Sequence, residues 1–327
     1  MRKWVKRLSL AAAAGMFLVL IQGSLVTTTG SADGCGNSWP LCHGKFVPSY
    51  TVETAIEFSH RFVVMIESFL IIGTAVGALW FWRHRLEVRI LAPVMVAFLF
   101  IQAGLGAASV MWPQSDPILA LHFGISLIAF ASTLLMTTFL YEIDGRDRRR
   151  DIRVPRSFVW AVWGLAAYTY VVVYIGAYVR HSGASLACSD WPLCNGNYIG
   201  GFEGAVGVAF GHRVSALVLI VATAVVAWWA LRFRAARPEL FWAVLIAFGL
   251  VVAQAISGAF VVLTRLETFP ALSHGMLVSA FFGTLAYLGF HVLPRPAAAV
   301  AAEQAPEQQE SRSPAFAGRT PATASNR

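Results

Sequence analysis

The stretch CGNSWPLCHG, Cys35 to Gly44, returns almost unchanged as CSDWPLCNG, Cys188 to Gly196. The similarity continues beyond these loops at a constant offset of 152 positions. The matching segments are Trp39–Cys42 with Trp191–Cys194, His60-Arg61 with His212-Arg213, Gln102-Ala103 with Gln254-Ala255, Gly106-Ala107 with Gly258-Ala259, and His122 with His274. A register kept from Trp39 to His122 indicates an internal duplication, so the chain is predicted to consist of two related halves.

The composition predicts that both halves lie in a membrane. Of the 327 residues, 57% are hydrophobic and 13% are charged, whereas soluble proteins carry about 25% charged residues. Apolar runs long enough to cross a bilayer occur at eight places, near 8–27, 56–82, 90–111, 118–141, 157–179, 208–231, 239–263 and 270–292. We therefore predict an all-α polytopic membrane protein with eight transmembrane helices.

The number of helices per half sets the symmetry of the repeat. Four helices bring each half back to the side on which it began, so the two four-helix bundles are predicted to be parallel and related by a pseudo-twofold axis along the membrane normal. The predicted divisions are an N-terminal half at 1–141, a basic linker at 142–156, a C-terminal half at 157–292 and a disordered tail at 293–327.

The distribution of positive charge predicts the orientation. Twenty of the 25 Lys and Arg residues lie in the N-terminus, the loops at 83–89, 142–156 and 232–237, and the tail. The positive-inside rule then places both termini in the cytoplasm and the cysteine loops outside a cell membrane. The run RDRRRDIRVPR is interpreted as a topology signal rather than a nucleic-acid patch. The first apolar run is expected to be retained rather than cleaved, because GSLVTTTG matches GAYVRHSG in the second half.

Four histidines stand at one depth in the predicted helices. His60, His122, His212 and His274 lie about four to six residues inside the outer ends of the second, fourth, sixth and eighth helices, roughly 6–9 Å below the hydrocarbon surface. Ionisable residues inside a membrane mark functional sites, although a single one often only bonds a neighbouring helix. The remaining histidines, His43, His84, His181 and His291, are expected to be solvated or interfacial.

The number of histidines per half favours haem. Two imidazoles from facing helices can form the axial pair of a b-type haem, so His60 is paired with His122 and His212 with His274. Zinc would require three or four clustered ligands. No C-x-x-C-H motif for covalent haem attachment is present. Arg61 and Arg213 could hold haem propionates, or extend to lipid headgroups.

The two halves differ at their carboxylates. Glu57 precedes His60 by three residues on the same helix face, where the second half has Ala209. Such a carboxylate could exchange protons beside the haem of the first half. Glu67 is matched by Leu219, and both a hydrogen bond to a neighbouring helix and a place in a proton path remain open for it.

These motifs resemble the haem A synthase family, bacterial type with paired loop cysteines. The resemblance rests on E-x-x-H-R at Glu57–Arg61, Gly211-His212-Arg213, His122, His274 and the cysteine pairs. It implies a membrane oxidoreductase that converts the C8 methyl group of haem O to the formyl group of haem A. It further implies haem b on His212 and His274, substrate haem at His60 and His122, and an important role for Glu57. Haem O synthase and the assembly machinery of haem-copper terminal oxidases are the implied partners, and homo-oligomer formation remains open.

The cysteines fit this topology as disulfides. On an oxidising outer face, two short-range pairs predict the bonds Cys35–Cys42 and Cys188–Cys194, since neither spacing is typical of zinc. The Cys35–Cys42 pair could also be redox-active.

Two other functions compete with the synthase interpretation. A di-haem b cytochrome that relays electrons without modifying haem would explain the four histidines but not Glu57. A transporter would explain the parallel repeats, but it predicts broken helices at mid-membrane.

Overall fold

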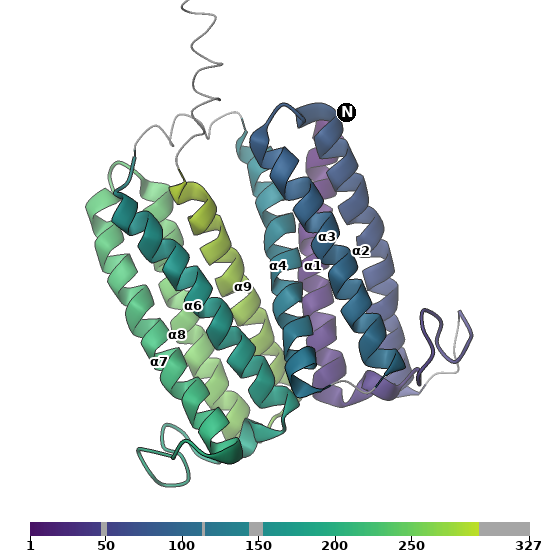
Figure 1. The fold of residues 1–327 in the computed structure, drawn as a ribbon, viewed down its shortest axis with the longest axis vertical. Helices are drawn as coiled ribbons and strands as arrows, with labels where there is room; N and C mark the ends of the chain where they lie inside the picture. The colour runs from purple at the N-terminus through teal and green to yellow at the C-terminus, as the bar shows by residue number, and fades with distance from the viewer. Residues whose placement is uncertain (47–50, 113–114, 144–152, 294–327) are drawn as a thin grey trace, which may run out of the picture.

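The structure is a computed structural model that describes residues 1–46, 51–112, 115–143 and 153–293. Within these residues the chain forms eight long helices (Figure 1). Their bounds are α1 Arg2–Thr29, α2 Val52–Trp82, α3 Leu86–Met111, α4 Asp116–Glu142, α6 Arg156–His181, α7 Gly204–Ala230, α8 Pro238–Leu263 and α9 Thr268–Val292. Three short 3-10 turns, η1 Ser31–Asp33, η2 Ala184–Leu186 and η3 Leu231–Phe233, follow α1, α6 and α7.

The predicted fold class is confirmed. Each of the eight apolar runs is a helix, and all eight helices are long and apolar enough to cross a membrane. Large apolar side chains such as Phe69, Trp80 and Phe100 are exposed on the outer surface, as expected for helices that face lipid. Most of the predicted linker at 142–156, and the predicted tail at 293–327 except Leu293, fall outside the described residues.

The helices are arranged in two groups of four. Figure 1 shows α1–α4 beside α6–α9, and both disulfide loops lie at the end of the molecule opposite the N-terminus. The groups meet where α1 contacts α9 and where α4 contacts α6 and α9. This arrangement is compatible with the predicted pair of parallel bundles. We call the end with the two loops the disulfide end, and the opposite end, where Arg2, Arg83, Arg156 and Arg237 lie, the basic end.

Each group has its own apolar core. Fully buried side chains of the first group include Met95 and Phe139, and those of the second include Phe158 and Leu285. In both groups most core residues come from the middle and basic-end portions of the helices. Side chains therefore fill the basic half of the molecule, and the space between the helices opens toward the disulfide end.

The two loops repeat each other in detail. The predicted disulfides Cys35–Cys42 and Cys188–Cys194 are both formed. The Trp39–Pro40 and Trp191–Pro192 peptide bonds are both cis, and each loop closes on an isolated antiparallel bridge, from Cys42 to Lys45 or from Cys194 to Asn197. The duplication read from the sequence therefore extends to the loop backbone.

Candidate functional site

One large cavity occupies the disulfide-end half of the molecule. Its volume is about 1500 Å³, and residues from all eight long helices line it. All four intramembrane histidines, His60, His122, His212 and His274, are among them. The four histidines, which were predicted to lie at one depth, therefore line the same cavity.

Each of these histidines packs against a glycine of the preceding helix. A Cβ atom built on the glycine would lie 3.4 Å from the ring Cε1 atom for Gly23 and His60, and 3.5 Å for Gly106 and His122. In the second half the same distance is 2.7 Å for Gly176 and His212, and 3.1 Å for Gly258 and His274. Glycine lets the imidazole lie close to the neighbouring backbone, so the same ring-holding contact occurs four times.

The two histidines of each half lie near each other, and their pairing as haem ligands stays a prediction. His60 and His122 lie close enough for a charge on one ring to act on the other, and the same holds for His212 and His274. Nδ1 of His60 and Nδ1 of His122 are buried without a protein hydrogen-bond partner in the described chain. His274 differs, because Ser257 Oγ lies 2.9 Å from its Nδ1 and Gln254 Nε2 lies 3.1 Å from its Nε2.

This donor set fits haem better than a bare metal ion. Across the described ranges, no group of three or more His, Cys, Asp or Glu side chains is placed to hold a metal. The histidines instead line a largely apolar cavity, two from each half, and two facing imidazoles would suit one b-type haem per half.

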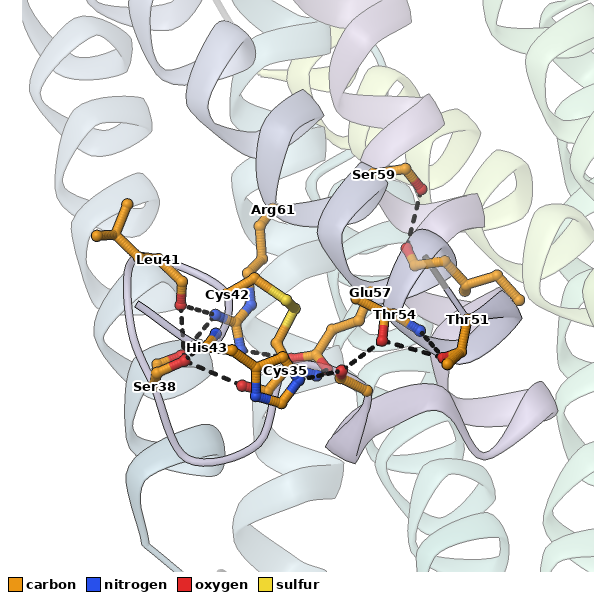
Figure 2. The surroundings of a disulfide bond; sticks show 12 residues. Cys35, Ser38, Leu41, Cys42, His43, Thr51, Thr54, Glu57, Ser59 and Arg61 are labelled. Atoms are coloured by element: carbon orange, nitrogen blue, oxygen red, sulfur yellow. Dashed lines mark hydrogen bonds and ion pairs between the residues drawn. A yellow bond between two sulfur atoms is a disulfide. The ribbon is translucent and has the colours of Figure 1, made fainter. Parts of the chain in front are cut away.

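Glu57 joins the cavity wall to the first disulfide loop (Figure 2). Its side chain is buried, and its Oε2 accepts a 2.7 Å hydrogen bond from the backbone N–H of Cys35. Its Oε1 pairs with Nη2 of Arg61 at 2.5 Å. Of the described residues that line the cavity, Glu57 is the one with an acidic side chain.

Arg61 completes this link between helix and loop. Its Nη1 donates to the carbonyl oxygens of Ser38 at 2.7 Å and Leu41 at 3.1 Å, as Figure 2 shows. Glu57 and Arg61 were expected in separate roles, and their pairing was not foreseen. The spacing of four residues, which puts two side chains on one helix face, was the available signal.

The second half holds its loop without a carboxylate from the helix. Nη1 of Arg213 donates to the carbonyl of Leu193 at 2.5 Å, and Nη2 donates to that of Cys188 at 3.0 Å. Ala209 stands where the first half has Glu57. Both arginines also line the cavity, so their predicted contact with propionates stays a prediction.

Asp190 stabilises the second loop from within. Its carboxylate accepts hydrogen bonds from the backbone N–H groups of Asn195 at 2.6 Å and Gly196 at 2.8 Å. The bond from Gly196 is the main cause that holds the pKa of Asp190 below its usual value. Ser38, the matching residue of the first loop, accepts from the N–H of His43 with its hydroxyl instead.

Two polar contacts between the halves were not foreseen. Arg180 of α6 lines the cavity and donates from Nη2 to the carbonyl of Thr27 in α1 at 3.0 Å. At the basic end, Nε2 of His291 lies 2.7 Å from Oε2 of Glu142. The expectation that His291 is solvated or interfacial was wrong, because its side chain is buried in this contact.

The fold and the site together define a class: a polytopic helical membrane protein with two pairs of histidines in the wall of one large cavity. Comparison with known proteins narrows that class. Residues 49–286 match the COX15-CtaA family model, described as cytochrome oxidase assembly protein. The chain belongs to this family.

Relatives within the family are named haem A synthases. The chain is 42% identical to that of Geobacillus kaustophilus over 292 residues, which cover 88% of this chain and 91% of the relative. Identity to the enzyme of Bacillus licheniformis is 43% over 293 residues, with 88% and 95% covered. Identity to that of an Exiguobacterium species is 44% over 284 residues, with 85% and 89% covered.

Proposed function

We propose that this protein is a haem A synthase, which oxidises the C8 methyl group of haem O to the formyl group of haem A. The main support for the proposal is that the two histidine sites match except for one carboxylate. Both halves present two histidines packed on glycines, yet Glu57 places a carboxylate in the wall of the first site alone. The similarity to haem A synthases over most of the chain supports the same reaction.

The two sites are assigned different haems. His212 and His274 hold a resident haem b, whose iron supplies one-electron transfer when it is bound. His60 and His122 hold the substrate haem, next to Glu57. The contact of Ser257 with Nδ1 of His274 fixes its ring, as expected for the ligand of a permanent cofactor, and Gln254 at Nε2 would give way to the iron. The domain division at 1–141 and 157–292 follows these roles.

Glu57 is assigned the proton chemistry of the first site. If His60 and His122 both bind the iron of the substrate haem, no position on it would be open for oxygen, so we infer that water would donate the oxygen atom. Oxidation of the methyl group to a formyl group with water would release four protons and four electrons, and the electrons would pass to an acceptor outside this chain. Glu57 is placed to accept such a proton, because its carboxylate lines the cavity and is oriented by Arg61 and Cys35.

The arginines and loops are assigned to substrate binding. Arg61 and Arg213 lie in the cavity wall under the loops, where their guanidinium groups can pair with propionates. Trp39 and Trp191 also line the cavity and would cover the porphyrin edges. We interpret both disulfides as structural bonds that stabilise the loops that carry these tryptophans.

The orientation follows from the positive charges. We propose that the basic end faces the cytoplasm and that the disulfide end faces outward from the cell membrane. Haem O would reach the cavity from a haem O synthase in the same membrane. The product would pass to the assembly of haem-copper oxidases, in line with the name of the family model.

The proposal is tested by producing the chain in a host that makes haem O, followed by haem extraction and chromatography. We expect haem A in membranes that contain the chain and none in the control host. A purified protein with two tightly held b haems and no formylated haem would contradict the proposal and favour the electron-relay cytochrome. The electron-relay cytochrome remains the second candidate because both histidine pairs pack on glycines in the same way.

A further inference from the structure

Glu67 is a buried carboxylate that the proposed reaction does not yet use. It lies in α2, seven residues beyond His60, and its side chain is 2% exposed. Neither Oε1 nor Oε2 has a hydrogen-bond partner among the described residues. Glu67 is absent from the cavity lining although its neighbours Ser68 and Phe69 belong to it, so its carboxyl group lies outside the cavity wall.

The neighbouring helix makes room for this carboxyl group. A Cβ atom added to Gly15 of α1 would collide with Oε2 of Glu67. Gly23 packs in the same way on His60, and Gly73 of α2 faces Leu8. These contacts show that α1 and α2 run antiparallel side by side, with Glu67 pointing at α1.

The antiparallel packing of α1 and α2 places polar groups at successive depths between His60 and the basic end. We call each of these depths a level. Gln22 adjoins Gly23 at the level of His60, and its Oε1 is buried without a partner among the described residues. Glu67 follows about 10 Å further along α2. Another seven residues on stands Thr74, which is fully buried.

The Thr74 level is the third polar level. The Thr74 hydroxyl has no protein partner within the described chain. Ser9 of α1 lies at this level, since Leu8 faces Gly73. Thr137 of α4 joins it by donating to the carbonyl of Ser9 at 2.7 Å. Polar groups therefore continue from the His60 site toward the basic end.

The second half has mostly apolar residues at the matching positions. The offset of 152 matches Glu67 with Leu219 and Thr74 with Val226, and in α1, where Gly23 matches Gly176, an offset of 153 matches Gln22 with Ile175. Ser9 corresponds to Val162, and Leu219, Val226 and Val162 all belong to the apolar core of the second group. Tyr168 stands where the first half has Gly15, and its hydroxyl bonds the carbonyl of Ser215. The second half thus has tyrosine and leucine at the positions of glycine and glutamate. The matching helix pair therefore packs without a carboxyl group.

The surroundings of Glu67 disfavour a static charge. No charged residue occurs in α1 after Arg7, in α3 after Arg89 or in α4 between Asp116 and Glu142. An ionised carboxylate without a partner is costly in such a place. We therefore expect a carboxyl group to be kept at this position only if its protonated form has a function. Isolated buried polar groups of this kind are typically hydrated or functional.

We propose that Glu67 relays protons between the His60–His122 site and the basic end, through the polar level of Thr74, Ser9 and Thr137. This rests on the proposed function, in which oxidation releases protons at the first site. The O–H bond of Glu67 forms as a proton arrives from the site and breaks as the proton passes to water, and chains of water molecules would bridge the gaps of about 10 Å between levels. Glu57 serves the reaction itself, and Glu67 carries the proton away.

The first test uses variants of the purified full-length protein. Glu67→Gln and Glu67→Leu, the latter copying the second half, are expected to slow haem A formation at least about tenfold with little change in the KM for haem O. Glu67→Asp should restore part of the rate and of the solvent deuterium isotope effect. If Glu67→Leu turns over at the normal rate with the normal isotope effect, the relay is overturned.

Two buried threonines, Thr74 and Thr223, allow a role in the proton relay to be distinguished from a role in packing. Thr74→Val and Thr223→Val both alter a fully buried threonine, but the Thr223 hydroxyl already bonds the carbonyl of Leu219 in its own helix. We expect Thr74→Val to slow turnover several-fold and Thr223→Val to leave it unchanged. Equal effects of the two substitutions would indicate a packing role only.

A third readout does not depend on turnover. The infrared spectrum of the protein should contain a carboxylic acid C=O band that shifts in deuterated water and is lost in Glu67→Gln. Absence of that band would overturn the relay. Absence of haem A from the wild-type protein, with the band present and exchanging, would instead contradict the proposed function alone.

Discussion

The two halves share helices, loops and histidine–glycine contacts, and they differ where the first half carries carboxylates. Both loops are closed by a disulfide and held by an arginine of the following helix. Among the described residues, only the first loop also bonds a carboxylate of the following helix, Glu57, through the N–H of Cys35. Under the proposed function, duplication supplied two sites for the same kind of group, and a few polar substitutions gave one of them acid–base chemistry.

The largest expected effect comes from removing one histidine from each half. His212→Ala should abolish the resident haem b and all activity. His60→Ala should abolish turnover while the protein keeps its haem b. The haem-to-protein ratio of each purified variant, with haem chromatography, measures both. Equal haem loss in the two variants would break the proposed division between the halves.

Substitution of the first-half carboxylate should come next. We expect Glu57→Ala to lower haem A formation by at least about a hundredfold, because proton transfer by a positioned side chain contributes about 10²–10⁴-fold. The His212–His274 site should stay filled. The matched variant Ala209→Glu puts a carboxylate four residues before Arg213 and should add no activity. Near-normal haem A from Glu57→Ala would refute the role assigned to this residue.

The glycines under the histidines offer a graded comparison. In Gly176→Ala the new Cβ would lie 2.7 Å from Cε1 of His212, whereas in Gly23→Ala it would lie 3.4 Å from Cε1 of His60. The tighter contact should displace its ring at a cost of about 1–3 kcal/mol, and haem b should dissociate correspondingly faster. The Gly23 variant should have the smaller effect. Haem-transfer rates to an apoprotein acceptor would measure the difference, and the reverse order would contradict this difference in packing between the two halves.

The disulfides should contribute similarly to stability but differently to activity. Removal of either pair by serine substitution should cost about 2 kcal/mol, since both close short loops. Loss of Cys35–Cys42 should also lower turnover, because the N–H of Cys35 orients Glu57. Thermal unfolding and haem A formation of both double variants would test this. Equal activity loss from the Cys188–Cys194 pair would argue against a special link between the first loop and the chemistry.

The smallest expected effect concerns acid stability of the second loop. Backbone N–H groups, chiefly that of Gly196, hold the folded-state pKa of Asp190 below the ordinary value of 3.8. The stabilisation is therefore complete above the ordinary value and is lost as the pH falls through the depressed one. Asp190→Asn should remove this pH dependence, whereas Ser38→Ala in the first loop should not alter it. Unfolding curves at several acidic pH values would show the difference.

Much of this architecture could be predicted from the sequence. The eight helices follow from long apolar runs, and the common depth of the four histidines follows from their similar distances to the outer ends of these runs. Glu57 stood out because its counterpart is Ala209. The pairing of Glu57 with Arg61 and the burial of His291 were missed, because an acid and a base on one helix, or at two helix ends, can meet several different partners.

The sequence by itself determined the number of spans, the duplication, the disulfide pairs and the residues that differ between the halves, because these depend on composition and spacing along the chain. The tertiary structure decided which glycine supports each histidine, that Glu57 bonds the N–H of Cys35, and that Glu67 points at Gly15. The physical reason is that helices apolar on nearly every face leave their rotation and register unspecified. Only packing against the neighbouring helices fixes which side chains meet.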